Sequence, residues 1–130
     1  MGYTSGQKKE MDAIFEAFAG FVQEQNYFDI VYSPKAGYLR ILVEDPEEGT
    51  ISLDSPEKML EYLCSDVIND VVYSPDNPKK SHDDRVLTAY EETESRRRLA
   101  AILETLKGEK DCAAVIADRY IKAYQGMEED

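Results

Sequence analysis

The sequence predicts an α+β fold: a three-stranded antiparallel meander with two helices packed on it (α-β-β-β-α), followed by a C-terminal antiparallel helical hairpin. Three observations lead to this prediction. Apolar residues recur with helical spacing in four segments, β-branched and aromatic residues alternate over residues 27–53, and proline or glycine separates these segments. At 130 residues the chain is expected to be a single domain over 1–130, with its core at 6–74 and its hairpin at 83–126.

The strongest helix signal runs from Asp54 to Ser74. The sequence allows two alternative N-terminal caps for this helix. One is Asp54 with Glu57 as a reciprocal cap, and the other is Ser55 with Pro56 in the first turn. Ser74-Pro75 ends the helix, because proline cannot donate a backbone hydrogen bond. A doubled apolar stripe should pack against the sheet and form the hydrophobic interior: Met59, Leu60, Leu63, Cys64, Val67, Ile68, Val71 and Val72.

A first helix is predicted over residues 6–26, because its apolar residues share one face. Its core side chains are expected to be Met11, Ile14, Phe15, Phe18, Phe21 and Val22.

Three strands are predicted at 27–32, 38–44 and 50–53, with turns at 33–37 and 45–49. Alternating hydropathy assigns one set of residues to the core: Phe28, Ile30, Tyr32, Leu39, Ile41, Val43, Ile51 and Leu53. The other face would then carry Tyr27, Asp29, Val31, Tyr38, Arg40, Leu42, Glu44 and Ser52. This second face is less polar than a solvated face, so later helices or a partner should cover it.

The hairpin is predicted as helices over 83–107 and 110–125, joined at Gly108. The middle of the first helix is highly charged. Glu92 with Arg96 and Glu94 with Arg98 have the spacing of ion pairs one turn apart, so this turn is expected to be self-neutralised and exposed.

The net charge of −12 disfavours binding to nucleic acid or to an anionic membrane, and it can attract a basic protein. Cys64 and Cys112 are expected to be buried free thiols, because each lies on an apolar helix stripe. A polar N-terminus and the lack of a run of about 20 apolar residues predict a cytoplasmic location.

No catalytic motif is present in the sequence, so no catalytic residue, metal or cofactor is assigned. Two weaker features remain. His82 lies beside two aspartates and could act as a general base. Asp45, Glu47, Glu48 and Asp54 gather around the second turn and could hold a hard cation. An enzyme with a carboxylate or metal-dependent site near Asp45–Asp54 or His82 is therefore one alternative.

The order of helix, three-stranded meander and helix over residues 6–73 is similar to that of double-stranded-RNA-binding domains. Those domains carry a lysine cluster at the start of their second helix to meet phosphates. Here that position reads Asp54-Ser55-Pro56-Glu57-Lys58 within an acidic segment. The resemblance therefore extends to topology and does not imply RNA binding.

The leading hypothesis is a small acidic intracellular protein that regulates or inhibits another protein by binding it. The predicted binding surface consists of Tyr27, Val31, Tyr38, Arg40 and Leu42, and a second candidate surface consists of Arg96, Arg97 and Arg98. The partner would be another protein, one of basic character. A self-associating structural protein, with a homodimer as its simplest form, is a further alternative.

Overall fold

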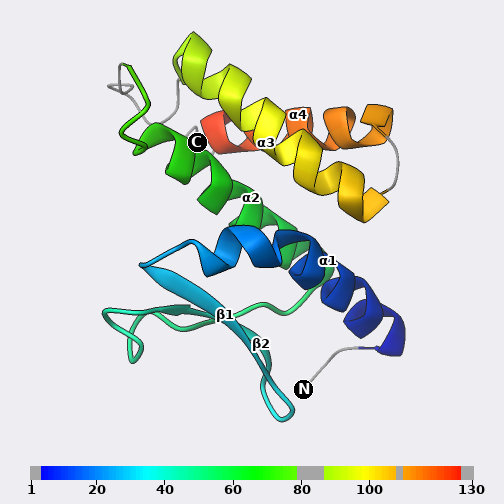
Figure 1. The fold of residues 1–130 in the computed structure, drawn as a ribbon. Coiled ribbons are helices and arrows are strands. Elements are labelled where there is room, and N and C mark those ends of the chain that lie inside the picture. Colours follow the sequence, from blue (N-terminus) through cyan, green and yellow to red (C-terminus); the bar gives the residue numbers. More distant parts are fainter. Residues whose placement is uncertain (1–3, 79–86, 108–109, 127–130) are drawn as a thin grey trace. The chain divides into compact units, whose positions relative to one another are not determined.

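The computed structural model describes residues 4–78, 87–107 and 110–126. The elements follow in the order α1 (Ser5–Gln23), β1 (Phe28–Ser33), β2 (Gly37–Leu42), β3 (Ile51–Ser52), α2 (Pro56–Val72), α3 (Ala89–Lys107) and α4 (Lys110–Gly126) (Figure 1). The predicted α+β fold is confirmed: an N-terminal helix, a three-stranded antiparallel sheet, and three helices of which α3 and α4 form a hairpin. The chain divides into two compact units, residues 1–60 and 61–130, with the boundary inside α2. The single-domain expectation stays a prediction.

Helix α1 begins one residue before its predicted start, because Thr4 and Gln7 form a capping box. The Thr4 side chain accepts a hydrogen bond from the Gln7 N–H, and the Gln7 side chain accepts one from the Thr4 N–H. The helix ends at Gln23 rather than at residue 26. The predicted apolar face is confirmed at Met11, Ile14, Phe18 and Val22, which are buried.

The sheet has the order β1-β2-β3 with both pairs antiparallel. Across the first hairpin Tyr32 lies opposite Tyr38 and Ser33 lies opposite Gly37. The Ser33 hydroxyl accepts the N–H groups of the turn at Lys35 and Ala36. Gly37 has a φ of 81°, a conformation that residues with a Cβ rarely adopt. Because paired residues share a face, the even-numbered residues of β1 and β2 lie on one side of the sheet.

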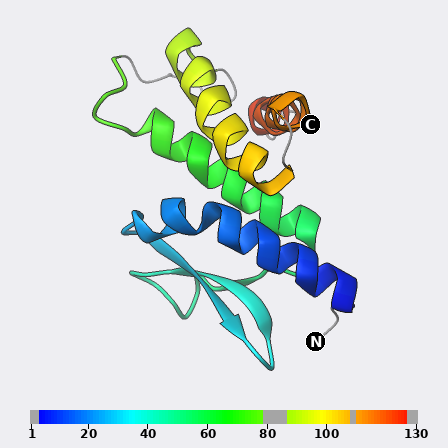
Figure 2. The ribbon, with the colours of Figure 1, turned by 45° about the vertical axis from the view of Figure 1, so that its right-hand side comes forward.

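Helix α1 packs on this even-numbered face (Figure 2). The Phe15 ring centroid lies 5.6 Å from that of Tyr38, and Phe21 lies 6.3 Å from Phe28. The face assignment of β2 from hydropathy is therefore wrong. Tyr38 and Arg40 are only 4% and 8% exposed beneath α1.

The same reversal applies to the other residues predicted for the second strand. Leu39 and Ile41, which were expected to face the core, are half-buried on the opposite side, and Val43 is 53% exposed. The β1 residues Phe28 and Ile30 are buried as predicted, whereas Tyr32 lies on the α1 face but is 38% exposed.

Helix α2 begins with the second of the two predicted caps. The Ser55 hydroxyl accepts the Lys58 N–H at 3.1 Å, and Pro56 occupies the first helical position. All eight residues of the predicted stripe are buried. Cys64 is a buried free thiol as expected, and burial raises its pKa above the usual range; Cys112 is free but half-buried.

Helix α3 begins at Ala89, later than the predicted residue 83, because Thr88 and Glu91 form a second capping box. The Glu91 N–H donates to the Thr88 hydroxyl at 3.2 Å, and the Thr88 N–H donates to the Glu91 carboxylate at 2.9 Å. Residues 83–86 and Gly108 lie outside the described residues. The buried side of α3 carries two polar residues in its first half, Glu91 and Ser95, before Leu99 and Leu103.

Candidate interaction surface

The sheet face opposite α1 is apolar along its middle strand. Leu39 and Ile41 lie on this side of β2, and Val31 of β1 lies directly opposite Leu39. Val43 follows directly after the strand and continues the same pairing, because its N–H donates to the Tyr27 carbonyl. These four residues are defined here as the open sheet face. Residues 4–55 contribute a single helix, α1, and it lies on the other side, so all four side chains keep part of their surface in contact with solvent (Figures 1 and 2).

Polar and acidic side chains border the open sheet face on both outer strands. On β1, Asp29 lies opposite Ile41 and is exposed. On β3, Ser52 lies opposite Leu39 and its hydroxyl donates to the Asp54 carboxylate at 2.8 Å. This hydrogen bond, together with the Lys58 ammonium, lowers the pKa of Asp54 and keeps its carboxylate charged.

The loop that joins β2 to β3 adds further negative charge. Glu44, Asp45, Glu47 and Glu48 are all exposed. Residues 27–54 contain six acidic side chains and two basic ones, and one of the two, Arg40, is buried on the α1 side. The surroundings of the open sheet face are therefore strongly acidic.

The five predicted binding residues do not share one surface. Val31 belongs to the open sheet face, and Tyr27 is 40% exposed beside it, with its backbone carbonyl accepting the Val43 N–H. Tyr38, Arg40 and Leu42 lie on the α1 side. The Arg40 guanidinium stacks 4.7 Å from the Phe28 ring centroid, a cation–π contact that places a charged residue in the core.

A polar cluster also fixes α1 on the sheet, and the sequence analysis did not identify it. The Tyr38 hydroxyl donates to the Asp12 carboxylate, and the Lys8 ammonium lies 2.9 Å from the same carboxylate. Tyr38 first, and then Lys8, lower the pKa of Asp12. The cluster is a contact between α1 and β2, so Tyr38 faces α1 and not the side of the sheet on which it was expected to meet a partner.

The arginines of the second predicted surface, Arg96–Arg98, form ion pairs within residues 61–130. Arg96 bridges Glu92 and Asp118 of α4, and Arg98 bridges Glu94 and Asp70 of α2. Both helix pairs predicted from their spacing are thus confirmed. The expectation that this whole turn is exposed is wrong, because Ser95 at its centre is 0% exposed.

Arg97 is the most exposed of the three arginines, with 67% of its side chain accessible, and it pairs with Glu94 at 2.6 Å. Hydrogen bonds from Arg97 and Arg98 lower the pKa of Glu94 to about 2. Arg96 and Arg98 therefore connect α3 to α4 and α2, while Arg97 pairs within α3, and little of the charge of the three is left for a partner.

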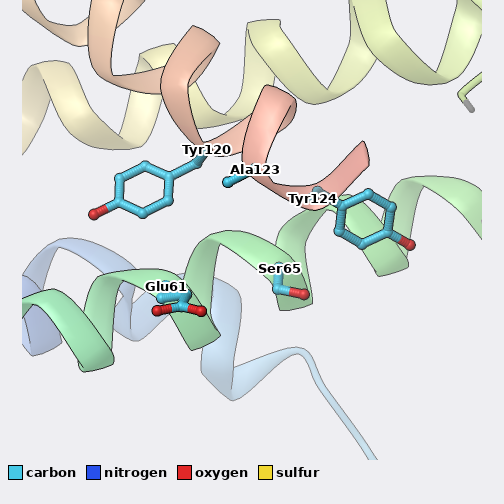
Figure 3. A pocket seen from close by; sticks show the side chains of 5 residues that line it. All are labelled: Glu61, Ser65, Tyr120, Ala123 and Tyr124. Atoms are coloured by element: carbon cyan, nitrogen blue, oxygen red, sulfur yellow. The ribbon is translucent and has the colours of Figure 1, made fainter. Parts of the chain in front are cut away.

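A small hollow lies between α2 and α4, and it is too small to bind a substrate. Glu61 and Ser65 of α2 face Tyr120, Ala123 and Tyr124 of α4 (Figure 3). Its volume of about 20 Å³ would hold one water molecule. The Tyr124 hydroxyl turns away to donate to Asn69 at 2.7 Å.

The acidic residues named for the enzyme alternative point to no metal site in the part of the chain that is described. Asp45, Glu47, Glu48 and Asp54 are exposed, and the Asp45 carboxylate accepts the Glu48 N–H within its own turn. Among the described residues, no three of His, Cys, Asp or Glu gather as metal ligands would. His82 lies outside the described residues.

Comparison of the chain with protein-family models, with curated proteins and with solved structures finds no match in any of the three. None of the helices over the described residues combines the length and the apolar composition that crossing a membrane requires.

Proposed function

We propose that this protein acts by binding another protein through the open sheet face, as a regulator or inhibitor of that partner. The observation that supports the proposal is the reversed side-chain pattern of β2. Leu39 and Ile41 of this strand, and Val43 directly after it, lie on the side opposite α1, while Tyr38 and Arg40 are buried on the side that α1 covers. A sheet face that only met solvent would carry polar residues in its central strand.

The proposal is tested by site-specific photocrosslinking in the cells that produce the protein. A photoreactive amino acid is placed at position 43, where the native valine is 53% exposed, and in a matched control at position 115, where Val115 of α4 is 65% exposed. We expect a discrete crosslinked protein from position 43 that is absent from position 115.

The variant used as a competitor is Val43→Asp, which places a charge at one end of the open sheet face, where the native side chain is 53% exposed. Added as an unlabelled competitor, the native protein should displace the crosslinked partner, whereas Val43→Asp should need a concentration about tenfold higher or more. Val115→Asp should compete like the native protein. Equal crosslinking from both positions, or equal competition by both variants, would refute the proposal.

A further inference from the structure

We infer that the occupant of the open sheet face is an amphipathic α-helix of the partner, lying along β2 with its apolar stripe on Leu39, Ile41 and Val43 and with lysine or arginine on both flanks. This inference rests on the proposed function and specifies its partner. Three features of the sheet support it: the spacing of its apolar residues, the acidic side chains beside them, and the limited hydrogen-bonding capacity of its edges.

The spacing of the apolar residues suits a helix. Alternate residues of a strand lie about 6.7 Å apart, and residues four apart in a helix advance by about 6 Å along its axis. Three helical residues at i, i+4 and i+8 can therefore meet Leu39, Ile41 and Val43 in turn. A helix about 10 Å wide covers two strand spacings of about 4.8 Å, so its flanks would lie over β1 and β3.

The charges beside the stripe suit basic flanks. On the β1 side the flank of such a helix would meet Asp29, and on the β3 side it would meet Asp54, whose pKa the Ser52 hydroxyl and Lys58 lower. Both carboxylates would attract lysine or arginine and repel glutamate. A second copy of the chain would bring the same acidic border against itself, so self-association through this face is disfavoured.

The edges of the sheet argue against the other common mode, in which an extended peptide adds a strand. Because Val43 donates to Tyr27, the hydrogen-bonding groups of Ile30 point away from β2, towards the free edge. The Asp29 carboxylate already accepts the Ile30 N–H at 2.8 Å. The opposite edge strand, β3, has only two residues, Ile51 and Ser52. Neither edge offers a long row of available backbone groups.

The inference is tested on the full chain with three synthetic peptides of about 18 residues, a length that gives five helical turns. The first has a leucine stripe at helical spacing with lysine flanks, the second replaces each lysine by glutamate, and the third has the composition of the first in an order that destroys the stripe. Affinity is measured by fluorescence anisotropy, and the contact site is mapped from amide chemical shifts.

We expect the lysine peptide to shift amides at Val31, Leu39, Ile41 and Val43, and to bind at least tenfold more tightly than the other two peptides. Val43→Asn should weaken this binding about tenfold, whereas Val115→Asn should not change it. Asp29→Asn, which keeps an oxygen for the Ile30 N–H, should weaken it about two- to fivefold at low salt.

Four outcomes would overturn the inference. If the glutamate peptide bound as tightly as the lysine peptide, the partner helix would not need basic flanks. If the third peptide, which lacks the stripe, bound as tightly as the first, net charge alone would explain the binding. Shifts confined to the outer edge of β1 would indicate strand addition. A dimer that Val43→Asn dissociates in sedimentation would identify a second copy as the occupant. Each of the first three leaves the crosslink from position 43 in place, so a failure here is distinguishable from a failure of the proposed function.

Discussion

Glutamine at position 94 removes the carboxylate on which two arginines converge. In the native protein, Arg97 and Arg98 together lower the pKa of Glu94 from 4.5 to about 2. A shift of that size corresponds to roughly 3 kcal/mol if it were fully expressed as stability. Arg97 is 67% exposed, so water screens much of its contribution, and we expect Glu94→Gln to lower the free energy of unfolding by about 1 to 2 kcal/mol at neutral pH.

The stability difference between the native protein and Glu94→Gln should depend on pH in one direction only. A carboxyl group with a lowered native pKa contributes stability above its unfolded pKa and loses that stability as the pH falls towards its native pKa. The difference between the native protein and Glu94→Gln should therefore be full above about pH 6, decline below 4.5 and disappear near a pH of about 2.

Urea titrations from about pH 6 to about pH 3, followed by the methyl NMR signals of Leu99 and Leu103, report this difference for the C-terminal unit. Glu104→Gln is the matched control, on the same helix and outside this network of ion pairs. A difference that stays constant with pH, or an equal loss from Glu104→Gln, would show that the two arginines do not stabilise the fold through Glu94.

Three other substitutions test the packing. Gly49→Ala should lower the free energy of unfolding by about 1 to 3 kcal/mol, measured by urea titration, because an added Cβ would lie 2.6 Å from the Leu42 Cβ. Ser95→Ala should raise it by about 1 kcal/mol in the same assay, because the buried Ser95 hydroxyl has no hydrogen-bond partner. Tyr38→Phe should raise the pKa of Asp12, measured by carboxyl NMR titration, because the strongest cause of its lowered value is the Tyr38 hydroxyl.

The helices were predictable because their signals are local. The stripe of α2 is buried over its whole length, and the cap at Ser55 follows from a rule about hydroxyls and proline at helix starts. The capping boxes at Thr4 with Gln7 and at Thr88 with Glu91 have the same local character. They would have set both helix starts more accurately than the apolar spacing did.

The faces of β2 were not predictable from hydropathy, because its aliphatic residues are divided between the two sides: Leu39 and Ile41 lie opposite α1, and Leu42 lies on the α1 side. The turn before β2 is a better guide to which side each residue of the strand faces. A turn over residues 33–37 places Tyr32 opposite Tyr38, and opposite residues always share a face. Hydropathy favours Leu39 and Ile41 as core residues, and it does not predict an arginine buried against the Phe28 ring, as Arg40 is.

Two arginines of the run Arg96–Arg98 determine how α3 is aligned along the neighbouring helices. Apolar stripes repeat every turn, so α3 could slide past its neighbours by one turn, about 5.4 Å, and still bury leucine against alanine. Arg96 reaches Asp118 on α4 and Arg98 reaches Asp70 on α2, and such a slip would separate both pairs. Arg96 and Arg98 thus select one register of α3 among several that would bury apolar side chains equally well. A doubly neutralised chain, Asp70→Asn with Asp118→Asn, should keep its helical circular dichroism but show heterogeneous methyl signals, and sharp single signals would contradict this role.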